Sequence, residues 1–504
     1  MSTRALPVLD VVRPNRASAD RAQAAPELAE FATDDLALPR FHVWTLGCQM
    51  NHSDSEEMAG ALAAAGCAES PDLESADLIV INSCAIREQA EQKVIGRMGH
   101  LANLRRANPQ LRVVLTGCSV RTDNAAGLKR RYPEVDLFLR PDEEPELTAR
   151  LGLAGATAPG RMQGAQREVG DLRRQSATSA WLPIIYGCDK TCTYCIVPFS
   201  RGPERSRPFD DVVAEARSLA AAGYKEVTLL GQNVNSYGHD LPTDSRFGDV
   251  VTGRHLGRQL ELDGRPDMAA LLRAIDGLRT ADGVRAISRL RFVTSHPWDL
   301  SERLIGAMAE CPSVCEHLHL PVQSGDDTVL RRMGRQYSIA AYLELVARLR
   351  EAIPGITLTT DVIVGFCGET EAQFERTLDL LRTVRFETVF AAAFSVRPGT
   401  PAAKLDDDVP RAEKKRRLQA LLDLQEGIGL EANEAWVGRT TEVLVDQQRP
   451  PSSHAGDGSA PRLAGRNRNN KLVHFDGSRE LLGRLVEVSV EHAGPYALVG
   501  SLDG

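Results

Sequence analysis

The chain lacks any long apolar run. None of its 504 residues lies in a stretch that approaches the roughly 18 uninterrupted apolar residues of a membrane helix, and residues 1–40 contain no compact apolar segment of the signal-peptide kind. Those forty residues do carry six Asp or Glu, whereas transit peptides are poor in acids. These absences favour a cytoplasmic protein with no membrane partner, and they predict a disordered extension over 1–40.

The chain also has no excess of positive charge and few cysteines. Its 60 Lys and Arg face 68 Asp and Glu, so the net charge is -8 and any nucleic-acid site must be local. Ten Cys without an export signal are better explained as metal ligands, catalytic groups or buried thiols than as disulfides. A hydrophobic content of 42% with 25% charged residues excludes a disordered or fibrous chain.

The order of apolar segments predicts an α/β protein of several domains. From 41 to 150, short apolar runs alternate with helical patterns, which indicates an N-terminal α/β domain with a parallel sheet. A Gly-, Ala- and Gln-rich linker is expected over 151–178. Over 179–435, six strand candidates separated by helix-length segments predict a partial (βα)6 barrel, interrupted by an insertion at 239–266. Short strands between polar turns then predict a small all-β barrel over 436–504.

Cys188, Cys192 and Cys195 form a C-x-x-x-C-x-x-C pattern directly after the first strand candidate of the central domain. Three closely spaced thiolates can hold three irons of a 4Fe-4S cluster and leave the fourth iron open for a substrate or cofactor. A structural zinc site would need a fourth Cys or His nearby, and neither His239 nor Cys311 lies at a zinc-like spacing. Zinc and scattered buried thiols therefore stay as the weaker alternatives.

This motif at this place resembles the radical S-adenosylmethionine superfamily. The resemblance implies that the open iron binds the amino and carboxylate groups of S-adenosylmethionine, and that the reduced cluster cleaves it to a 5'-deoxyadenosyl radical. It also implies that Tyr194, between the last two cysteines, packs beside the cofactor. The alternative for Tyr194 is an ordinary aromatic residue of a loop.

Cys48, Cys84 and Cys118 are distant in sequence, yet each follows a predicted strand: FHVWTL, DLIVIN and RVVLT. The carboxyl ends of parallel strands share one edge of a sheet, where ligands bind in open α/β folds. The three thiols are therefore expected to converge on a second 4Fe-4S cluster with one open iron, and the alternative is three small buried residues. The other cysteines, which have no such placement, are expected to be core or loop thiols: Cys67, Cys311, Cys315 and Cys367.

Two separate sets of three cysteines resemble the methylthiotransferase family. The segments TLGCQMNHSDSE, INSCAIREQAEQKV, LLGQNVNSYG, TSHPWDL, LHLPVQSG, GFCGETE and SVRPGTPAA are similar to the branch that modifies N6-isopentenyl-adenosine in tRNA. The similarity extends from about residue 41 to the C-terminus, except for the 239–266 insertion. Sister branches act on threonylcarbamoyl-adenosine in tRNA or on a ribosomal-protein aspartate, and they remain the alternative function.

The resemblance implies the reaction and the partners. A sulfur and a methyl group are expected to be added to carbon 2 of the adenine beside the anticodon, with two molecules of S-adenosylmethionine used per turnover. The cluster at Cys48, Cys84 and Cys118 would present the sulfur, and the other cluster would generate the radical. The expected partners are tRNA carrying N6-isopentenyl-adenosine, an electron donor of flavodoxin or ferredoxin type, and iron-sulfur cluster assembly proteins.

Polar residues just beyond the barrel strands are the candidates for binding the cofactor, because catalytic loops gather at that end of such a barrel. Amides and hydroxyls there are expected to bind the cofactor carboxylate or a base edge, and the alternative is that they satisfy local turns. These candidates are Gln232, Asn233, Gln323, Ser324 and Asp361.

Local basic segments are the candidates for contacting RNA. The terminal β module resembles the small RNA-binding barrel of several tRNA-modifying enzymes, the TRAM domain, and its segment PRLAGRNRNNKL carries four basic residues and no acid. A second basic segment is RGPERSR at 201–207, and RAEKKRR at 411–417 is a third. Any one of them could instead be a solvated face. The predicted phosphate contacts are Arg205, Arg207, Arg462, Arg466, Arg468 and Lys471.

A non-enzymatic RNA-binding iron-sulfur sensor is the alternative from another class of function. A sensor would not need the barrel motifs around Cys188, and it would form no 5'-deoxyadenosine from S-adenosylmethionine. The enzyme is therefore the favoured hypothesis.

Overall fold

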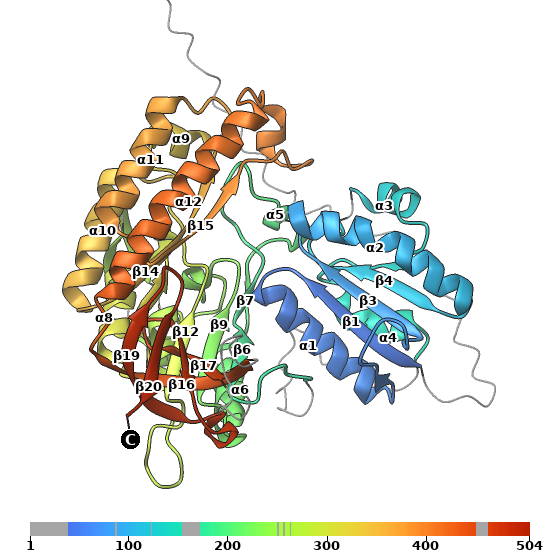
Figure 1. Cartoon of the computed structure of the whole chain (residues 1–504), viewed down its shortest axis with the longest axis horizontal. Coiled ribbons are helices and arrows are strands. Elements are labelled where there is room, and N and C mark those ends of the chain that lie inside the picture. The colour runs from blue at the N-terminus through green and yellow to red at the C-terminus, as the bar shows by residue number, and fades with distance from the viewer. Residues whose placement is uncertain are drawn as a thin grey trace, which may run out of the picture.

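The computed structural model describes residues 39–85, 88–121, 123–153, 172–248, 251–255, 258–262, 264–449 and 462–503. Almost all of the expected extension 1–40, and residues 154–171 of the expected linker, lie outside these residues. An N-terminal sheet with its helices lies beside a larger central domain, and a small β-barrel lies against one end of that domain (Figure 1). No helix in the described residues is long and apolar enough to cross a membrane.

The N-terminal unit is a parallel sheet in the order β2-β1-β3-β4-β5. Strands β3 and β4 are almost entirely buried because apolar helices and loops cover both faces, as parallel sheets require. Strands β1, β3 and β4 are neighbours, so their carboxyl ends lie together at one edge. The elements are β1 (Arg40–Leu46), α1 (Gln49–Ala64), β2 (Ala68–Glu69), β3 (Leu78–Ser83), α2 (Glu88–Ala107), β4 (Arg112–Thr116), α3 (Ala125–Arg131), β5 (Leu137–Phe138) and α4 (Leu147–Arg150).

The central unit is an incomplete parallel barrel. In the described residues its six strands form two three-stranded sheets, β6-β9-β12 and β13-β14-β15, joined by a parallel bridge between Leu290 and Val314. Amphipathic helices on the outside bury Leu, Ile and Val against the strands in one large core. The strands are β6 (Ser179–Pro183), β9 (Glu226–Leu230), β12 (Arg289–Phe292), β13 (His317–His319), β14 (Thr357–Val364) and β15 (Thr388–Ala393). The helices are α6 (Phe209–Ala221), α7 (Met268–Asp276), α8 (Glu302–Glu310), α9 (Asp327–Arg332), α10 (Ile339–Ala352), α11 (Glu371–Val384) and α12 (Arg411–Glu434).

Two segments of the central unit depart from the regular alternation. The predicted first strand LPIIYG is divided, because the chain leaves β6 after Pro183 and then forms an antiparallel pair of β7 (Ile185–Tyr186) with β8 (Arg205–Ser206). That pair closes the cysteine loop, which also contains the short helix α5 (Val197–Ser200). Within the expected insertion, β10 (Val251–His255) and β11 (Arg258–Leu262) pair as an antiparallel hairpin.

The terminal unit is a closed barrel in the order β16-β17-β18-β20-β19. The strands predicted from the sequence are TTEVLVD, KLVHFD and RLVEVSV, which correspond to β16, β18 and β19. β17 and β20 are not predicted, because Gly465 and Gly500 interrupt their apolar pattern. A Cβ at Gly465 would lie 2.0 Å from the carbonyl oxygen of Leu444, so this glycine allows β16 and β17 to approach closely. The strands are β16 (Thr440–Arg449), β17 (Arg462–Asn467), β18 (Leu472–Asp476), β19 (Leu485–Ala493) and β20 (Leu498–Leu502).

Two buried arginines of β12 fasten the terminal barrel to the amino-terminal ends of the central strands. Arg289, which is fully buried, donates to the carbonyl oxygen of Arg466 at 2.5 Å and to Glu442 at 2.8 Å. Arg291 donates to the carbonyl oxygens of Asn467 at 2.7 Å and Arg468 at 2.9 Å. The terminal barrel therefore covers the end of the central core where the strands begin. Cys188 and the catalytic loops lie at the opposite end.

Removing this fastening should loosen the terminal barrel. In Arg291→Met, two carbonyl groups lose their donor and the carboxylate of Glu226, 2.8 Å from Arg291, stays buried without its partner. We expect a loss of about 3–5 kcal/mol, the usual cost of breaking a buried ion pair. Limited proteolysis and thermal unfolding measure it, with the exposed Arg466→Met as the control that should change stability by under about 0.5 kcal/mol. Equal protease sensitivity of the two variants would contradict the docking role.

Candidate active site

The first cysteine set lies at the carboxyl edge of the N-terminal sheet, as the sequence predicts. Cys48 caps α1, and its backbone N–H and thiol both donate to Oδ1 of Asn51, at 3.2 and 3.4 Å. The amide of Asn51 in turn donates to Oδ1 of Asn82 at 2.9 Å, and Asn82 donates back to the carbonyl oxygen of Asn51 at 2.8 Å. This buried pair of asparagines joins the first turn of α1 to the end of β3.

Cys84 and Cys118 are almost completely buried, with 1% and 2% of their surface exposed. The backbone N–H of Cys84 donates to the carbonyl oxygen of Leu46 at 2.8 Å, which aligns it with the end of β1. The thiol of Cys118 accepts a hydrogen bond from Nε of Arg201, 3.1 Å away in the central unit. Burial raises the pKa of Cys118, the guanidinium of Arg201 opposes that rise, and the charge of Cys48 adds to it.

The second cysteine set occupies the loop between β7 and α5. The backbone N–H of Cys188 donates to the carbonyl oxygen of Gly202 at 3.1 Å, and that of Cys195 donates to Cys192 at 3.1 Å. Burial raises the pKa of Cys195 to about 12 and that of Cys188 well above its usual value. The thiol of Cys192 accepts a hydrogen bond from Nη1 of Arg335 at 3.6 Å. Each cysteine set thus has one buried arginine donating to a sulfur.

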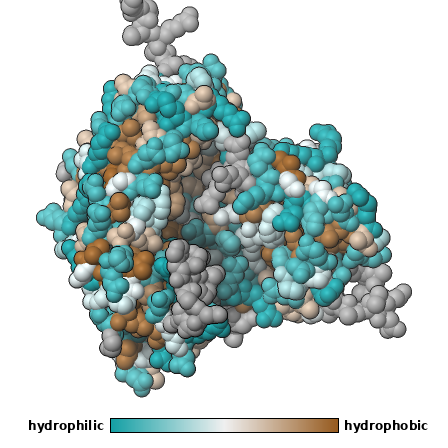
Figure 2. Space-filling model, in the orientation of Figure 1, coloured by the Kyte–Doolittle hydropathy of each residue, from teal (hydrophilic) through white to brown (hydrophobic). Residues whose placement is uncertain are grey.

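Cysteines of both sets lie at the interface between the N-terminal and central units. Cys118 is close enough to Cys195 for its charge to raise the pKa of the Cys195 thiol, after the larger effects of burial and of Cys192. Cys48 packs with Met50 beside Tyr186 and Leu230 of the central unit. A hollow lies between the two units (Figure 2), and α5 and β7 lie where these units meet (Figure 1).

Each set offers three free thiols, the number of protein ligands that leaves one iron of a 4Fe-4S cluster open. Among the described residues, no three His, Cys, Asp or Glu side chains converge on one metal-ion position. All six thiols are free of disulfides. A 4Fe-4S cluster takes each thiolate on a different iron, and hydrogen bonds to the sulfurs, such as those from Arg201 and Arg335, are an established way to tune it.

Gly187, directly before Cys188, has no space for a side chain. Its φ is +75°, and an added Cβ would lie 2.1 Å from the carbonyl oxygen of Pro203. In Gly187→Ala, the new Cβ should therefore push the cysteine loop away from residues 202–203. The left-handed backbone at an alanine destabilises the fold by at least roughly 1 kcal/mol. We also expect the displaced loop to hold less iron per chain. The control is Gly202→Ala, which has a φ of +76° but no atom within 4 Å of the new Cβ. Iron analysis after anaerobic reconstitution compares them, and equal iron in both would contradict the steric argument.

The predicted cofactor residues after β9 lie at this loop. Oε1 of Gln232 accepts the backbone N–H of Gly187 at 2.7 Å, so this side chain braces the cysteine loop. Nδ2 of Asn233 donates to Asp299 at 2.7 Å, and Asp299 also pairs with Lys190 of the loop at 2.6 Å. Oδ1 of Asn233 is buried and has no hydrogen-bond partner among the described residues, which leaves an acceptor for a bound group.

The other predicted cofactor residues lie at separate places in the central unit. Gln323 bridges to β14, where its backbone N–H donates to the carbonyl oxygen of Asp361 at 2.9 Å and its φ is +73°. Ser324 is buried and accepts the backbone N–H of Asp326 at 3.3 Å, a turn contact. The Asp361 side chain is 40% exposed and lies 3.5 Å from His319. Tyr194 packs its ring edge-on against Phe366, 6.5 Å between centroids.

The basic segments are only partly available to RNA. Lys471 is buried and pairs with Glu387 and Asn433, while Arg468 pairs with Glu316 at 2.7 Å where the terminal barrel docks. Arg207 is also buried, 2.8 Å from Glu215. The prediction of direct phosphate contacts is therefore wrong for Arg207 and Lys471, because a charge pattern does not distinguish a surface cation from one that is buried and paired with an acid. The exposed or half-exposed candidates are Arg205, Arg462 and Arg466.

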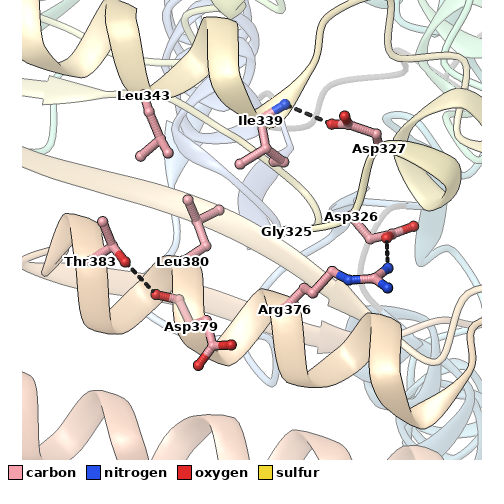
Figure 3. Close-up of a pocket in the computed structure, with 9 residues that line it drawn as sticks. All are labelled: Gly325, Asp326, Asp327, Ile339, Leu343, Arg376, Asp379, Leu380 and Thr383. Atoms are coloured by element: carbon pink, nitrogen blue, oxygen red, sulfur yellow. Dashed lines mark hydrogen bonds and ion pairs between the residues drawn. The ribbon is translucent and has the colours of Figure 1, made fainter.

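The pocket in Figure 3, with a volume of about 490 Å³, lies away from this site. Residues of α9, α10 and α11 and of the loop before α9 form it on the outside of the barrel, and none of the six cysteines contributes. Its polar groups already bind one another: Asp327 accepts the backbone N–H of Ile339 at 2.7 Å, and Asp326 pairs with Arg376 (Figure 3). We assign the pocket to the packing of the outer helices.

Sequence reasoning missed the residues that surround the sulfurs. Arg201 stands in the basic segment 201–207, where its neighbours suggest a surface patch, yet it is 5% exposed. Arg335 lies in no recognised motif. Asn51 belongs to the segment TLGCQMN, three residues after Cys48, which is the spacing of a helix capping box and the one available signal.

Two family descriptions match this chain. Residues 182–381 match the Radical SAM superfamily, and residues 40–140 match a family described as uncharacterized protein family UPF0004. The first match covers the strands and loops around Cys188, and the second covers the sheet that carries Cys48, Cys84 and Cys118.

Curated relatives match nearly the whole chain. The tRNA-2-methylthio-N(6)-dimethylallyladenosine synthase of Carboxydothermus hydrogenoformans is 42% identical over 473 residues, 93% of this chain and 100% of that protein. The enzyme of the same name from Acetivibrio thermocellus is 40% identical over 464 residues, 91% of this chain and 90% of that protein.

A solved structure shares the fold. The radical S-adenosylmethionine methyltransferase TsrM from Kitasatospora setae, with cobalamin and a [4Fe-4S] cluster bound, aligns with a TM-score of 0.52 at 17% identity, over 72% of this chain and 77% of that one. At this identity the likeness concerns the fold alone. It agrees with the α/β architecture, in which a sheet unit precedes a partial barrel.

Proposed function

The chain belongs to the tRNA-2-methylthio-N(6)-dimethylallyladenosine synthase family of radical S-adenosylmethionine enzymes, and we propose its reaction and site from that premise. It adds a methylthio group to carbon 2 of N6-isopentenyl-adenosine beside the anticodon of tRNA, in the cytoplasm. Cys188, Cys192 and Cys195 hold the 4Fe-4S cluster that binds S-adenosylmethionine. Cys48, Cys84 and Cys118 hold the second cluster.

One observation supports this assignment above the others: cysteines of the two sets, which belong to different units, lie close together at one interface. Cys118 lies within hydrogen-bond distance of Arg201, which follows the C-x-x-x-C-x-x-C loop. The charge of Cys118 also raises the pKa of the Cys195 thiol. A reaction that joins a sulfur group to an activated base needs both sites to reach the same substrate atom, because reacting groups must be held within a few ångströms.

The bound cofactors supply the hard chemistry, one site providing an organic radical and the other a methylated sulfur. The chain's own residues have a positioning and shielding role. Burial of Cys84 and Cys118 keeps water from the second site, and Gln232 fixes the loop that carries Cys188. We assign S-adenosylmethionine to the part of the site that contains the unpartnered Oδ1 of Asn233, together with Tyr194 and Asp361.

We assign RNA binding at the terminal barrel to its accessible basic side chains. Arg466 is exposed, whereas Arg468 two residues later is paired with Glu316. In Arg466→Ala, tRNA binding should weaken. The slope of log Kd against log salt concentration should also fall by about one, because one phosphate contact and its released counterion are lost. Filter binding at several salt concentrations measures this, and an unchanged salt slope would contradict a phosphate contact. Lys471→Ala is unsuitable as a control because Lys471 is buried and pairs with Glu387 and Asn433 of the central unit.

The reducing partner is an electron donor of flavodoxin or ferredoxin type, and iron-sulfur assembly proteins load the two sites. Both assignments follow from the need to fill two clusters and to reduce one of them. Binding of reduced flavodoxin or ferredoxin to the reconstituted protein, with consumption of S-adenosylmethionine as the readout, tests the first.

The substrate is tested with two tRNAs, one carrying N6-isopentenyl-adenosine and the other unmodified at that position. The protein is reconstituted anaerobically and given dithionite and S-adenosylmethionine, and the digested nucleosides are analysed by mass spectrometry. We expect a methylthio product only from the first tRNA. A product only on threonylcarbamoyl-adenosine would overturn the substrate assignment.

A further inference from the structure

Arg201 is the side chain that joins the two cysteine sites. It comes from the turn after α5, where its backbone N–H donates to the carbonyl oxygen of Val197 at 2.8 Å. Its Nε donates to the sulfur of Cys118 at 3.1 Å, and its Nη2 lies 2.6 Å from Oδ2 of Asp54 in α1. The side chains of Arg201 and Asp54 are only 3% and 0% exposed. One buried guanidinium therefore contacts two elements of the N-terminal unit from the central unit.

The next residue completes the connection to the other site. The carbonyl oxygen of Gly202 accepts the backbone N–H of Cys188 at 3.1 Å. The consecutive residues 201 and 202 thus hold Cys118 through a side chain and Cys188 through the backbone. Two adjacent residues, Arg201 and Gly202, therefore contact one cysteine of each set.

We propose that Arg201 is a positioning residue that sets the reduction potential of the cluster at Cys48, Cys84 and Cys118 and fixes that cluster against the Cys188 loop. A donor and a positive charge at a ligand sulfur stabilise the added negative charge when the cluster takes up one electron, so they raise its potential. Asp54 binds the neighbouring Nη2 of the same guanidinium, and its negative charge opposes this effect. The inference rests on the proposed function, because it requires Cys118 to bind an iron of the second cluster.

The test uses full-length protein in which Cys188, Cys192 and Cys195 are all alanine, so that only the second cluster remains after anaerobic reconstitution. A dithionite titration followed by electron paramagnetic resonance gives its potential. Three changes are compared in this background: Asp54→Asn, Arg201→Lys, and the double change Arg201→Gln with Asp54→Asn. The double change replaces the pair by neutral residues of similar shape, so no unpaired charge is left buried to unfold the protein.

The expected shifts have opposite signs. Asp54→Asn removes a negative charge and keeps the Arg201 donor, so the potential should rise. The double change removes the positive charge of Arg201, which is nearer to the cluster than Asp54, together with its hydrogen bond to Cys118, so the reduction potential should fall. Arg201→Lys keeps a positive charge, so its potential should be closer to that of the unchanged protein. A role in folding alone would lower the iron content and leave the potential of the remaining cluster the same in all variants, and that result would overturn the inference while leaving the proposed function intact. A background protein that binds no cluster would overturn both.

Discussion

Cys188→Ala should abolish the cleavage of S-adenosylmethionine, and with it all methylthiolation. The loss should be complete because a cluster held by Cys192 and Cys195 alone lacks one of the three protein ligands that keep a single iron open. The backbone contact from residue 188 to Gly202 does not depend on the side chain, so the fold around it should persist. Release of 5'-deoxyadenosine, measured by chromatography after reduction with dithionite, checks the prediction.

The control for this variant is Cys311→Ala. Cys311 is a buried thiol at the end of α8, remote from both cysteine sets, and its removal should cost stability but leave cleavage intact. Cleavage at the normal rate in Cys188→Ala would contradict the assignment of this loop to the radical-generating cluster.

Cys48→Ala should separate the two chemical steps. The protein should still cleave S-adenosylmethionine, because Cys188, Cys192 and Cys195 are untouched, but it should form no methylthio product. Cys48 is the half-buried member of its set, so an alanine there also disturbs the packing less than at Cys84 or Cys118. Nucleoside mass spectrometry and 5'-deoxyadenosine analysis of the same reaction measure the two outcomes.

This second prediction depends on the variant being folded. The capping box of α1 loses its thiol in Cys48→Ala, whereas the bond from the backbone N–H of residue 48 to Asn51 remains. Circular dichroism and the content of the remaining cluster serve as the check. Loss of cleavage equal to the loss of product, in folded protein, would mean that the two sites are not separate.

Much of the fold could be predicted from local patterns. The three strands before Cys48, Cys84 and Cys118 are short apolar runs followed by helices, and a parallel sheet puts their carboxyl ends together whatever covers them. Position along a strand was therefore enough to predict that these cysteines share one edge of the sheet. The same reasoning failed for β17 and β20, where glycines needed for close strand contact remove the apolar signal.

The groups around the thiols could not be predicted, because they depend on how two units pack. Arg201 and Lys471 look in the sequence like members of basic surface patches, yet one joins the N-terminal sheet and the other holds the terminal barrel. A cation that is paired with an acid far along the chain has no local signature. Gln232 is similar, since its partner Gly187 lies 45 residues earlier.

Iron counted per chain tests the central claim, two separate three-cysteine cluster sites, most directly. After anaerobic reconstitution the unchanged protein should hold about eight irons, and about four should remain when either Cys188, Cys192 and Cys195 or Cys48, Cys84 and Cys118 are replaced together by alanine. Full iron in either triple variant, or loss of all iron from a folded one, would contradict the account.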